Sequence, residues 1–403
     1  MAKLAIEGGR PLREHPFPAW PVFGKEDEAA LLRVLQSGKW GTMGPRAEEF
    51  QQLFSAFVGT RHGLCVANGT VSLEIALRAM EIGPGDEVIV PPYTFVATAS
   101  SVLTAGATPV FADIDPENFN CINPSSAEEM ITSRTKAIIP VHMAGCPADM
   151  GPILELAKKR GLFVLEDAAQ AHGAEYCGQK VGSIGDAASF SFQETKNLSA
   201  GEGGILTTNS EDLYEKCWTV HNTGRVPGGA WYQHEYLGSN FRMTEWQAAI
   251  LLGQLKRLPG QMETRERNAR LLYRMLEGID RIELFPLRGD FRYAWHLFMF
   301  KLEKGLAREV GKRKFARALT AEGIPTEPGY VNLAGQKLFQ TELVRRRLSR
   351  PIDYSSLELP STEQACEITL WFSQNMLLGD DSDMADIAEG ISKVVANSGE
   401  LRG

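Results

Sequence analysis

A lysine in a polar turn is the residue of this sequence best placed for covalent chemistry. Lys196 comes shortly after the apolar run 187–192, and a glycine-rich stretch, Gly201-Glu-Gly-Gly204, follows it. A lysine amine is nucleophilic only after it loses its proton, and burial or a nearby cation lowers its pKa. A turn at the end of a strand can project Lys196 into a cleft. The structural alternative is a solvated loop lysine.

An aspartate at the end of another apolar run suits the same chemistry. Asp167 closes the stretch Leu162-Phe-Val-Leu-Glu-Asp167, and small residues follow it. A carboxylate there can keep a pyridine nitrogen protonated, which makes the ring a better electron sink. Taken alone, Asp167 is equally typical of a helix N-cap. His172 is more typical of a structural histidine, and we do not include it among the catalytic candidates.

One turn and one serine suit a phosphate. Asn68-Gly69-Thr70 lies between an apolar run and a helical pattern, where free backbone N–H groups and the Thr70 hydroxyl favour an anion. Ser191 precedes Lys196 by five positions and is within reach of the same group. An ordinary N-cap is the alternative for the turn. The turn lacks the spacing GxGxxG, so a nicotinamide dehydrogenase gains little support.

An aromatic residue after a third apolar run suits a planar ring. The segment Pro91-Pro-Tyr-Thr-Phe95 follows the run 87–90 directly. A ring at the carboxyl end of a strand can stack on a planar cofactor, so Phe95 is a candidate. An aromatic residue in the core is the alternative.

The segments that must position these residues alternate between short apolar runs and helical patterns from about residue 50 to 210. The runs cover residues 63–67, 87–90, 109–112, 137–141, 162–165, 187–192 and 204–207. Nearly all-apolar runs are typical of strands buried on both faces, so the alternation predicts βαβ units on a mostly parallel sheet. In one unit, Asp149 predicts a helix N-cap and Gly161 the helix end. Ligands gather at the carboxyl ends of such strands.

The rest of the chain predicts a smaller α/β domain. Helical patterns cover residues 244–258, ended by Pro259-Gly260, and residues 262–277. A strand at 292–302 and helices at 312–322 and 382–396 follow. A chain of 403 residues is too long for one ordinary core. We therefore expect a large domain over residues 1–260, including an N-terminal arm, and a small domain over residues 261–403.

Composition argues against several classes of protein. Lysine and arginine total 42 against 50 acidic residues, a net charge of −8, which disfavours nucleic acid or an anionic membrane surface as the main partner. No apolar run reaches the length of a membrane span, and the first residues lack the apolar core of a signal peptide. The six cysteines show neither CxxC pairs nor zinc-ligand spacing. We expect reduced thiols, no metal and a cytoplasmic location.

Taken in order, these residues resemble the DegT/DnrJ/EryC1/StrS aminotransferases, fold-type I enzymes that use pyridoxal 5′-phosphate (PLP) and act on keto-sugars and keto-cyclitols. The block Ser191…Lys196…Gly201-Glu-Gly-Gly204 is highly specific for that family. The similarity covers nearly the whole chain, through the motifs Gly38-Lys-Trp-Gly-Thr-Met-Gly-Pro45, Asn68-Gly-Thr70, Val141-His-Met-Ala-Gly145, Glu166-Asp-Ala-Ala169 and Asn240-Phe-Arg-Met-Thr244.

The resemblance implies roles around the cofactor ring. Lys196 forms the internal aldimine and later moves the proton between the two reacting carbons. Asp167 pairs with the pyridine nitrogen, and Phe95 stacks on the ring. Gln170 takes the place of a polar residue, often histidine, near the phenolic oxygen.

The resemblance also implies roles around the phosphate. Gly69, Thr70 and Ser191 hold it within one subunit. Asn240 is expected to reach the phosphate of the neighbouring subunit, so the resemblance implies a homodimer with shared active sites.

Two stretches are similar to the aminocyclitol branch of the family. They are Val141-His-Met-Ala-Gly145 and Phe190-Ser-Phe-Gln-Glu-Thr-Lys196, and the branch includes glutamine:scyllo-inosose aminotransferases and 3-amino-5-hydroxybenzoate synthases. Nucleotide-sugar members usually have leucine-tyrosine where Met143-Ala144 stands. The resemblance thus implies ping-pong transfer of an amino group from glutamine or glutamate to a keto-cyclitol or keto-sugar. Tyr330 and His296 are further pocket residues by resemblance.

Two alternatives remain from the sequence. A PLP-dependent dehydratase, or an aromatising enzyme of the 3-amino-5-hydroxybenzoate synthase type, would use the same scaffold. A regulatory or binding protein that has lost catalysis is an alternative of another class. Lys196 is intact, which favours transamination.

Overall fold

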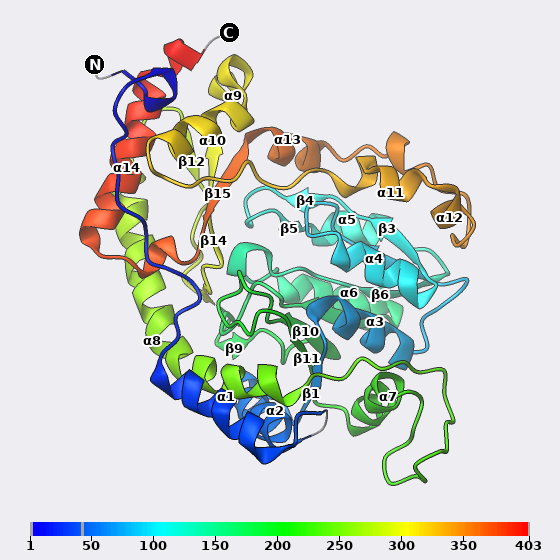
Figure 1. Ribbon diagram of the computed structural model, residues 1–403. Helices are drawn as coiled ribbons and strands as arrows, with labels where there is room; N and C mark the ends of the chain where they lie inside the picture. The colour runs from blue at the N-terminus through cyan, green and yellow to red at the C-terminus, as the bar shows by residue number, and fades with distance from the viewer. Residues whose placement is uncertain (1–2, 42–43, 402–403) are drawn as a thin grey trace.

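The computed structural model describes residues 3–41 and 44–401, and a seven-stranded sheet forms its centre (Figure 1). The strands lie in the order β1-β11-β10-β7-β6-β2-β3, and only β11 runs antiparallel to its neighbours. Each of the seven apolar runs forms one strand, so the prediction of a mostly parallel sheet is confirmed. The strands are β1 (His62–Val66), β2 (Glu87–Val90), β3 (Thr108–Phe111), β6 (Thr135–Ile138), β7 (Phe163–Asp167), β10 (Ala187–Ser191) and β11 (Gly204–Thr208).

Helices cover both faces of this sheet, and successive residues of a strand face opposite sides. Leu64 and Leu206 join one apolar cluster, with α3 (Gly69–Ala79), α4 (Ala97–Ala105) and α7 (Glu211–His221). Cys65 and Ile205 join another, with α2 (Pro45–Val58) and the first part of α8 (Glu245–Leu276). The sheet is therefore buried on both sides, which explains its nearly all-apolar strands.

The helix α6 (Met150–Arg160) confirms one predicted end and corrects the other. Gly161 ends it in the left-handed conformation, with φ 67°, as predicted. Asp149 occupies the N-cap position, but its side chain makes no capping bond. Instead, the Tyr176 hydroxyl donates to Asp149 Oδ1 at 2.8 Å. The carboxylate is thus used to hold the loop that contains β8 (Glu175–Tyr176) and β9 (Gln179–Lys180).

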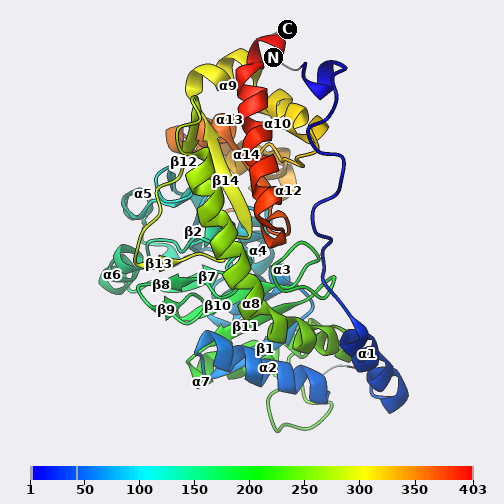
Figure 2. The same cartoon turned by 90° about the vertical axis from the view of Figure 1, so that its left-hand side faces the viewer.

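The prediction that Pro259-Gly260 ends a helix is wrong, because α8 continues through both residues. An interior proline costs a helix about 3 kcal/mol. Packing on both sides of the proline offsets this cost, since Leu258 and Met262 are both buried. Figures 1 and 2 show α8 beside α1 (Lys25–Ser37) and α2 at one end and beside α14 (Asp381–Ala396) at the other. The expected boundary at residue 260 falls inside α8, and the division into domains stays a prediction.

A second, antiparallel sheet lies beyond α8. It has the order β12-β14-β15, with β12 (Ile282–Leu284), β14 (Leu297–Leu302) and β15 (Thr369–Ser373). The predicted strand 292–302 is too long, because the chain turns at Trp295, where φ is 51°. On either side of that turn, Ala294 N–H donates to the Gly145 carbonyl and His296 N–H to the Ala144 carbonyl, both at 2.9 Å. This anchoring to the large sheet's loop breaks the strand.

Helices pack around this smaller sheet. The predicted helices 312–322 and 382–396 are confirmed as α10 (Lys312–Ala321) and α14. The remaining strands and α-helices of the described chain are β4 (Ile114–Asp115), β5 (Cys121–Ile122), β13 (Phe291–Arg292), α5 (Pro124–Glu129), α9 (Lys304–Val310), α11 (Lys337–Gln340), α12 (Glu342–Arg345) and α13 (Pro360–Ile368). Within the described part of the chain, no helix has the length and apolar character that crossing a membrane requires.

The N-terminal arm connects the two parts of the molecule, as Figure 2 shows. Arg13 is buried and pairs with Asp383 at 2.6 Å and Asp386 at 2.7 Å on α14. Farther along, the Trp20 indole N–H donates to the Glu194 carbonyl at 2.8 Å. The arm thus reaches the turn that carries Lys196. Within the motif at 38–45, residues 42–43 lie outside the described residues, as do residues 1–2 of the N-terminal segment.

Candidate active site

The predicted site residues meet at one edge of the large sheet. Strands β1, β2, β6, β7 and β10 share a direction, so their carboxyl ends lie at the same edge. Ser191 ends β10 and Asp167 ends β7, while Gly69 begins α3 just after β1. A Cβ atom on Gly69 would lie 2.8 Å from the Ser191 Cβ. The turn after β1 therefore packs directly against the end of β10, and only glycine permits this approach.

The start of α3 presents unpaired donors at this edge. Asn68 is the N-cap residue, and its Oδ1 accepts from the Val71 N–H at 3.0 Å. The first N–H groups of a helix, here those of Gly69 and Thr70, have no partner within the helix. Thr70 is exposed, and Ser191 is nearly buried beside the turn. Backbone donors, two hydroxyl groups and the positive end of a helix dipole together suit a phosphate.

Lys196 occupies the turn after β10 and is half-buried. Its backbone N–H donates to the Gln193 carbonyl at 2.9 Å, which closes the turn. Burial lowers the pKa of its amine to about 8, although the nearby Asp167 carboxylate acts to raise it. The half-buried side chain and the lowered pKa of its amine favour a nucleophilic lysine over the solvated-lysine alternative.

Asp167 is buried at the end of β7, and both of its oxygens accept hydrogen bonds. The Thr98 hydroxyl donates to Oδ2 at 2.8 Å, and the Ala169 N–H donates to Oδ1 at 3.3 Å. Burial raises the pKa of Asp167, while these two donors and the Lys196 amine act to lower it. No α-helix begins here, so the alternative of a helix N-cap is wrong. The carboxylate is oriented for a further donor.

Gln170 has a defined amide orientation. Its Oε1 accepts from the Ala144 N–H at 2.7 Å, so its Nε2 faces the Tyr330 hydroxyl at 3.1 Å. Burial raises the pKa of Tyr330 to about 12, which keeps that hydroxyl protonated. Tyr330 also packs edge-on against Tyr93. The amide therefore connects the large sheet's edge with the segment before α11.

Phe95 and Asn240 are both exposed. Phe95 has 58% of its surface exposed, so the alternative of a core aromatic is wrong, while Tyr93 two positions earlier is fully buried. The segment of Asn240 lies beside the end of β1, because the Ala67 N–H donates to the Phe241 carbonyl at 2.7 Å. Both side chains are thus available at the carboxyl edge of the sheet.

Burial lowers the pKa of two histidines near Lys196. His172 is fully buried between the rings of Phe190 and Phe192, at 5.6 and 5.8 Å, and burial lowers its pKa to about 3. This environment is that of a structural histidine. His296 Nδ1 lies 3.1 Å from Asn197 Oδ1, and burial lowers the pKa of His296 well below its ordinary value.

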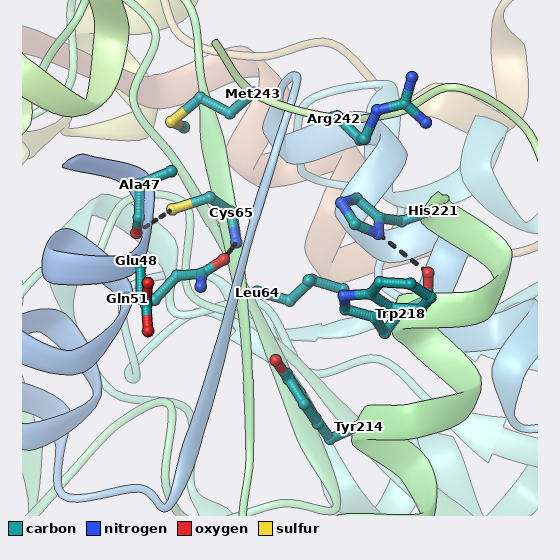
Figure 3. A pocket seen from close by; sticks show the side chains of 10 residues that line it. All are labelled: Ala47, Glu48, Gln51, Leu64, Cys65, Tyr214, Trp218, His221, Arg242 and Met243. Atoms are coloured by element: carbon teal, nitrogen blue, oxygen red, sulfur yellow. Dashed lines mark hydrogen bonds between the residues drawn. The ribbon is translucent and has the colours of Figure 1, made fainter. Parts of the chain in front are cut away.

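Two cavities of the described structure are lined by other residues. One of about 210 Å³ lies among α2, β1 and α7 (Figure 3). Its Cys65 thiol is buried, which raises the pKa, and burial lowers the pKa of its His221 to about 4. A protonated thiol and an uncharged imidazole held by the Trp218 carbonyl give it no activated nucleophile. The other, of about 620 Å³, lies among α9, α10 and α13.

Sequence reasoning missed three residues that orient the site. Thr98 binds Asp167, Ala144 binds Gln170, and Asn197 contacts His296. Thr98 carries no motif signal, because a helix hydroxyl is an ordinary feature of any sequence. Ala144 lies in the motif at 141–145, but the motif does not indicate that its backbone N–H binds Gln170. Asn197 could have been found, since it follows Lys196 directly.

A lysine and an aspartate at the carboxyl edge of a mainly parallel sheet define the fold-type I class, and solved structures agree. The crystal structure of 3-amino-5-hydroxybenzoic acid synthase is 32% identical, with a TM-score of 0.89, covering 96% of this chain and 100% of that chain. An aminotransferase from Psychrobacter cryohalolentis is 34% identical, with a TM-score of 0.87, covering 95% and 100%.

The family follows from the sequence as a whole. The model of the DegT/DnrJ/EryC1/StrS aminotransferase family matches residues 21–391. An L-glutamine:2-deoxy-scyllo-inosose aminotransferase from Streptomyces paromomycinus is 38% identical over 99% of this chain and 99% of its own length. The chain therefore belongs to the DegT/DnrJ/EryC1/StrS aminotransferase family, and it is an aminotransferase.

Proposed function

We propose that this aminotransferase uses PLP to move an amino group from glutamine or glutamate to a keto-cyclitol or keto-sugar by a ping-pong mechanism. The observation that carries the proposal is Lys196, whose amine has a pKa of about 8 beside the buried Asp167. The glutamine donor and a keto-cyclitol acceptor are favoured by the names of relatives that are 36–38% identical over nearly the full length.

The residues present fit PLP. The α3 start, the Thr70 hydroxyl and Ser191 would hold the phosphate, and the missing side chain of Gly69 leaves room for the strand end to approach. Asp167 would face the pyridine nitrogen, and Phe95 would cover one face of the ring. Bound PLP would supply an aldehyde that takes up the donor's amino group and a ring that accepts electron density.

Each residue then has a physical task. Lys196 Nζ removes the Cα proton of the amino donor and later returns a proton during amination of the acceptor. Asp167, oriented by the Thr98 hydroxyl and the Ala169 N–H, would keep a proton on the ring nitrogen of the cofactor. Gln170, whose Oε1 is held by the Ala144 N–H and whose Nε2 donates to the Tyr330 hydroxyl, would lie near the phenolic oxygen of the cofactor.

We infer that the site is completed in a homodimer by Asn240 of the partner subunit. The loop before this residue carries large apolar side chains that are well exposed in one chain: Trp231 at 70%, Tyr232 at 86% and Leu237 at 86%. Grouped exposed side chains of this kind mark interaction surfaces. Within each subunit we propose a large domain of residues 1–260 and a small domain of residues 261–403, with α8 continuous between them.

The proposal is tested by following both half-reactions. The PLP-loaded protein is mixed with glutamine, and loss of its visible absorbance reports amino uptake. A panel of keto-cyclitols, including 2-deoxy-scyllo-inosose, and keto-sugars is then added. Return of the absorbance with formation of the amine supports the proposal. Lys196→Ala is expected to show neither the band nor turnover, and a variant that still transaminates would refute the role of Lys196.

The same assay tests the dehydratase or aromatising alternative. The structural similarity to 3-amino-5-hydroxybenzoic acid synthase is the observation that favours it. That alternative predicts loss of water from a cyclic keto substrate, detected by mass spectrometry, without transfer of nitrogen to the acceptor.

A further inference from the structure

A histidine and a glutamate beside the proposed site take no part in the reaction described above. His142 Nε2 lies 3.0 Å from Glu166 Oε2, and neither side chain has any exposed surface. Glu166 precedes Asp167 in β7, and His142 follows β6, the adjacent strand. An ionised carboxylate is costly to bury unless other groups donate hydrogen bonds to it.

Glu166 accepts a hydrogen bond at every available position. Its Oε1 accepts from the N–H groups of Ile184 and Gly185, both at 2.8 Å. Its Oε2 accepts from the Gly182 N–H at 2.8 Å and from His142 Nε2. Four donors are what an ionised carboxylate can bind, and a protonated acid or an amide would place a donor against a donor. The site therefore requires the carboxylate.

The tautomer of His142 follows from its other nitrogen. The Ala148 N–H donates to His142 Nδ1 at 3.0 Å, so Nδ1 carries no proton. The proton is then on Nε2, from which it is donated to Glu166. The ring thus connects β7 to residue 148, at the far end of the loop that His142 begins.

Two backbone N–H groups of this loop hold two of the proposed cofactor-binding residues. The His142 N–H donates to the Asp167 carbonyl at 3.1 Å, which fixes the end of β7. Inside the loop, Ala144 has φ 59° and donates its N–H to Gln170. Loss of the His142 ring would remove the hydrogen bond to Glu166 and the hydrogen bond to the Ala148 N–H at the far end of the loop. The separation between the Asp167 and Gln170 side chains would then depend on the remaining backbone hydrogen bonds of the loop.

We propose that His142 and Glu166 are positioning residues for PLP, which hold the Asp167 carboxylate and the Gln170 amide at the separation that the cofactor ring requires. This inference rests on the proposed function, because both groups face PLP there. The hydrogen bonds of the His142 and Glu166 side chains are used within the protein. The two residues act through the strand end and the loop.

Substitutions at His142 separate its two hydrogen bonds. His142→Gln places an amide N–H near the Nε2 position and keeps the bond to Glu166. His142→Asn places an amide oxygen near Nδ1 and keeps the bond to Ala148. His142→Ala loses both bonds. Glu166→Gln keeps the shape but sets an amide against two donors, and the histidine cannot relieve this because its Nδ1 must accept from Ala148.

The experiment measures the dissociation constant of PLP and the absorption maximum of the bound cofactor, together with the thermal unfolding midpoint. We expect His142→Ala and Glu166→Gln to bind PLP at least tenfold more weakly and with a shifted maximum. The PLP affinities of His142→Gln and His142→Asn should lie between those of these variants and the wild type, because each keeps one of the two bonds. These two variants still test the inference if His142→Ala does not fold.

Glu87→Gln is the matched control. Glu87 is also fully buried in the same sheet, but it begins β2 and binds Arg134 and Arg350 at the other end of the strands. It should lose stability without change in PLP affinity or absorption maximum. If every variant of His142 and Glu166 bound PLP as the wild type does, this inference would be overturned and the proposed function would stand. An equal loss of PLP affinity in Glu87→Gln would have the same consequence. A wild-type protein that captures no PLP would overturn the proposed function and this inference with it.

Discussion

The pKa of Lys196 leads to a quantitative prediction about cofactor capture. With a pKa of about 8, about 9% of the amine is uncharged at pH 7, against about 0.03% for an ordinary value of 10.5. The difference is about 300-fold in the reactive form. The rate at which the protein without cofactor binds PLP covalently should therefore rise about tenfold per pH unit up to pH 8 and then level off.

The variant Asp167→Asn tests the same prediction in a second way. The carboxylate of Asp167 acts to raise the pKa of Lys196, so its removal should lower that pKa and move the plateau to a lower pH. Stopped-flow absorbance measures the rate, and Lys196→Arg gives the background from other lysines. A rate in the wild type that continues to rise above pH 10 would refute the reasoning, as would an Asp167→Asn plateau at higher pH.

Three further predictions concern packing. Gly69→Ala should weaken PLP binding at least tenfold, because its Cβ would meet the end of β10, whereas Gly24→Ala, with open space around it, should leave binding unchanged in equilibrium dialysis. His172 has a pKa of about 3 in the fold and 6.5 when unfolded, so the unfolded chain binds the extra proton, and the free energy of unfolding falls by about 2 kcal/mol between pH 6.5 and pH 5. His172→Phe should therefore make urea unfolding less sensitive to pH across that window. An unchanged pH dependence would contradict this. Arg13→Ala should cost about 3 kcal/mol of unfolding free energy, because the ion pairs of the buried Arg13 with two partly buried carboxylates on α14 are lost. Arg46→Ala, in an exposed pair, should cost less than about 1 kcal/mol, and equal costs would contradict the account of the arm.

The sheet and its active edge could be predicted because the relevant signals are local. Strands buried on both faces have to be apolar along their length, and Gly161 marks a helix end by its own backbone conformation. Since parallel strands share a carboxyl edge, Asp167 and Ser191 could be expected at the same edge of the sheet, and the pairing of β7 with β10 brings them together. Because Lys196 follows such a strand, its amine could be predicted to lie at the same edge.

Other features depend on contacts between distant segments. The continuation of α8 through Pro259 depends on packing against helices far away in the chain, which offsets a local cost. The orientation of Gln170 depends on a backbone N–H of Ala144 and a hydroxyl of Tyr330. The start of β14 at Leu297, later than predicted, depends on hydrogen bonds that Ala294 and His296 donate to the loop after β6. Such partners leave no periodic pattern in the sequence.

The central claim is that Lys196 is the residue that binds PLP covalently. The most direct measurement is borohydride reduction of the PLP-loaded protein, followed by proteolysis and mass spectrometry of every lysine-containing peptide. The account predicts one stoichiometric pyridoxyl-phosphate adduct on Lys196. Adducts scattered over exposed lysines, or an unmodified Lys196 in a protein with full PLP content, would contradict it.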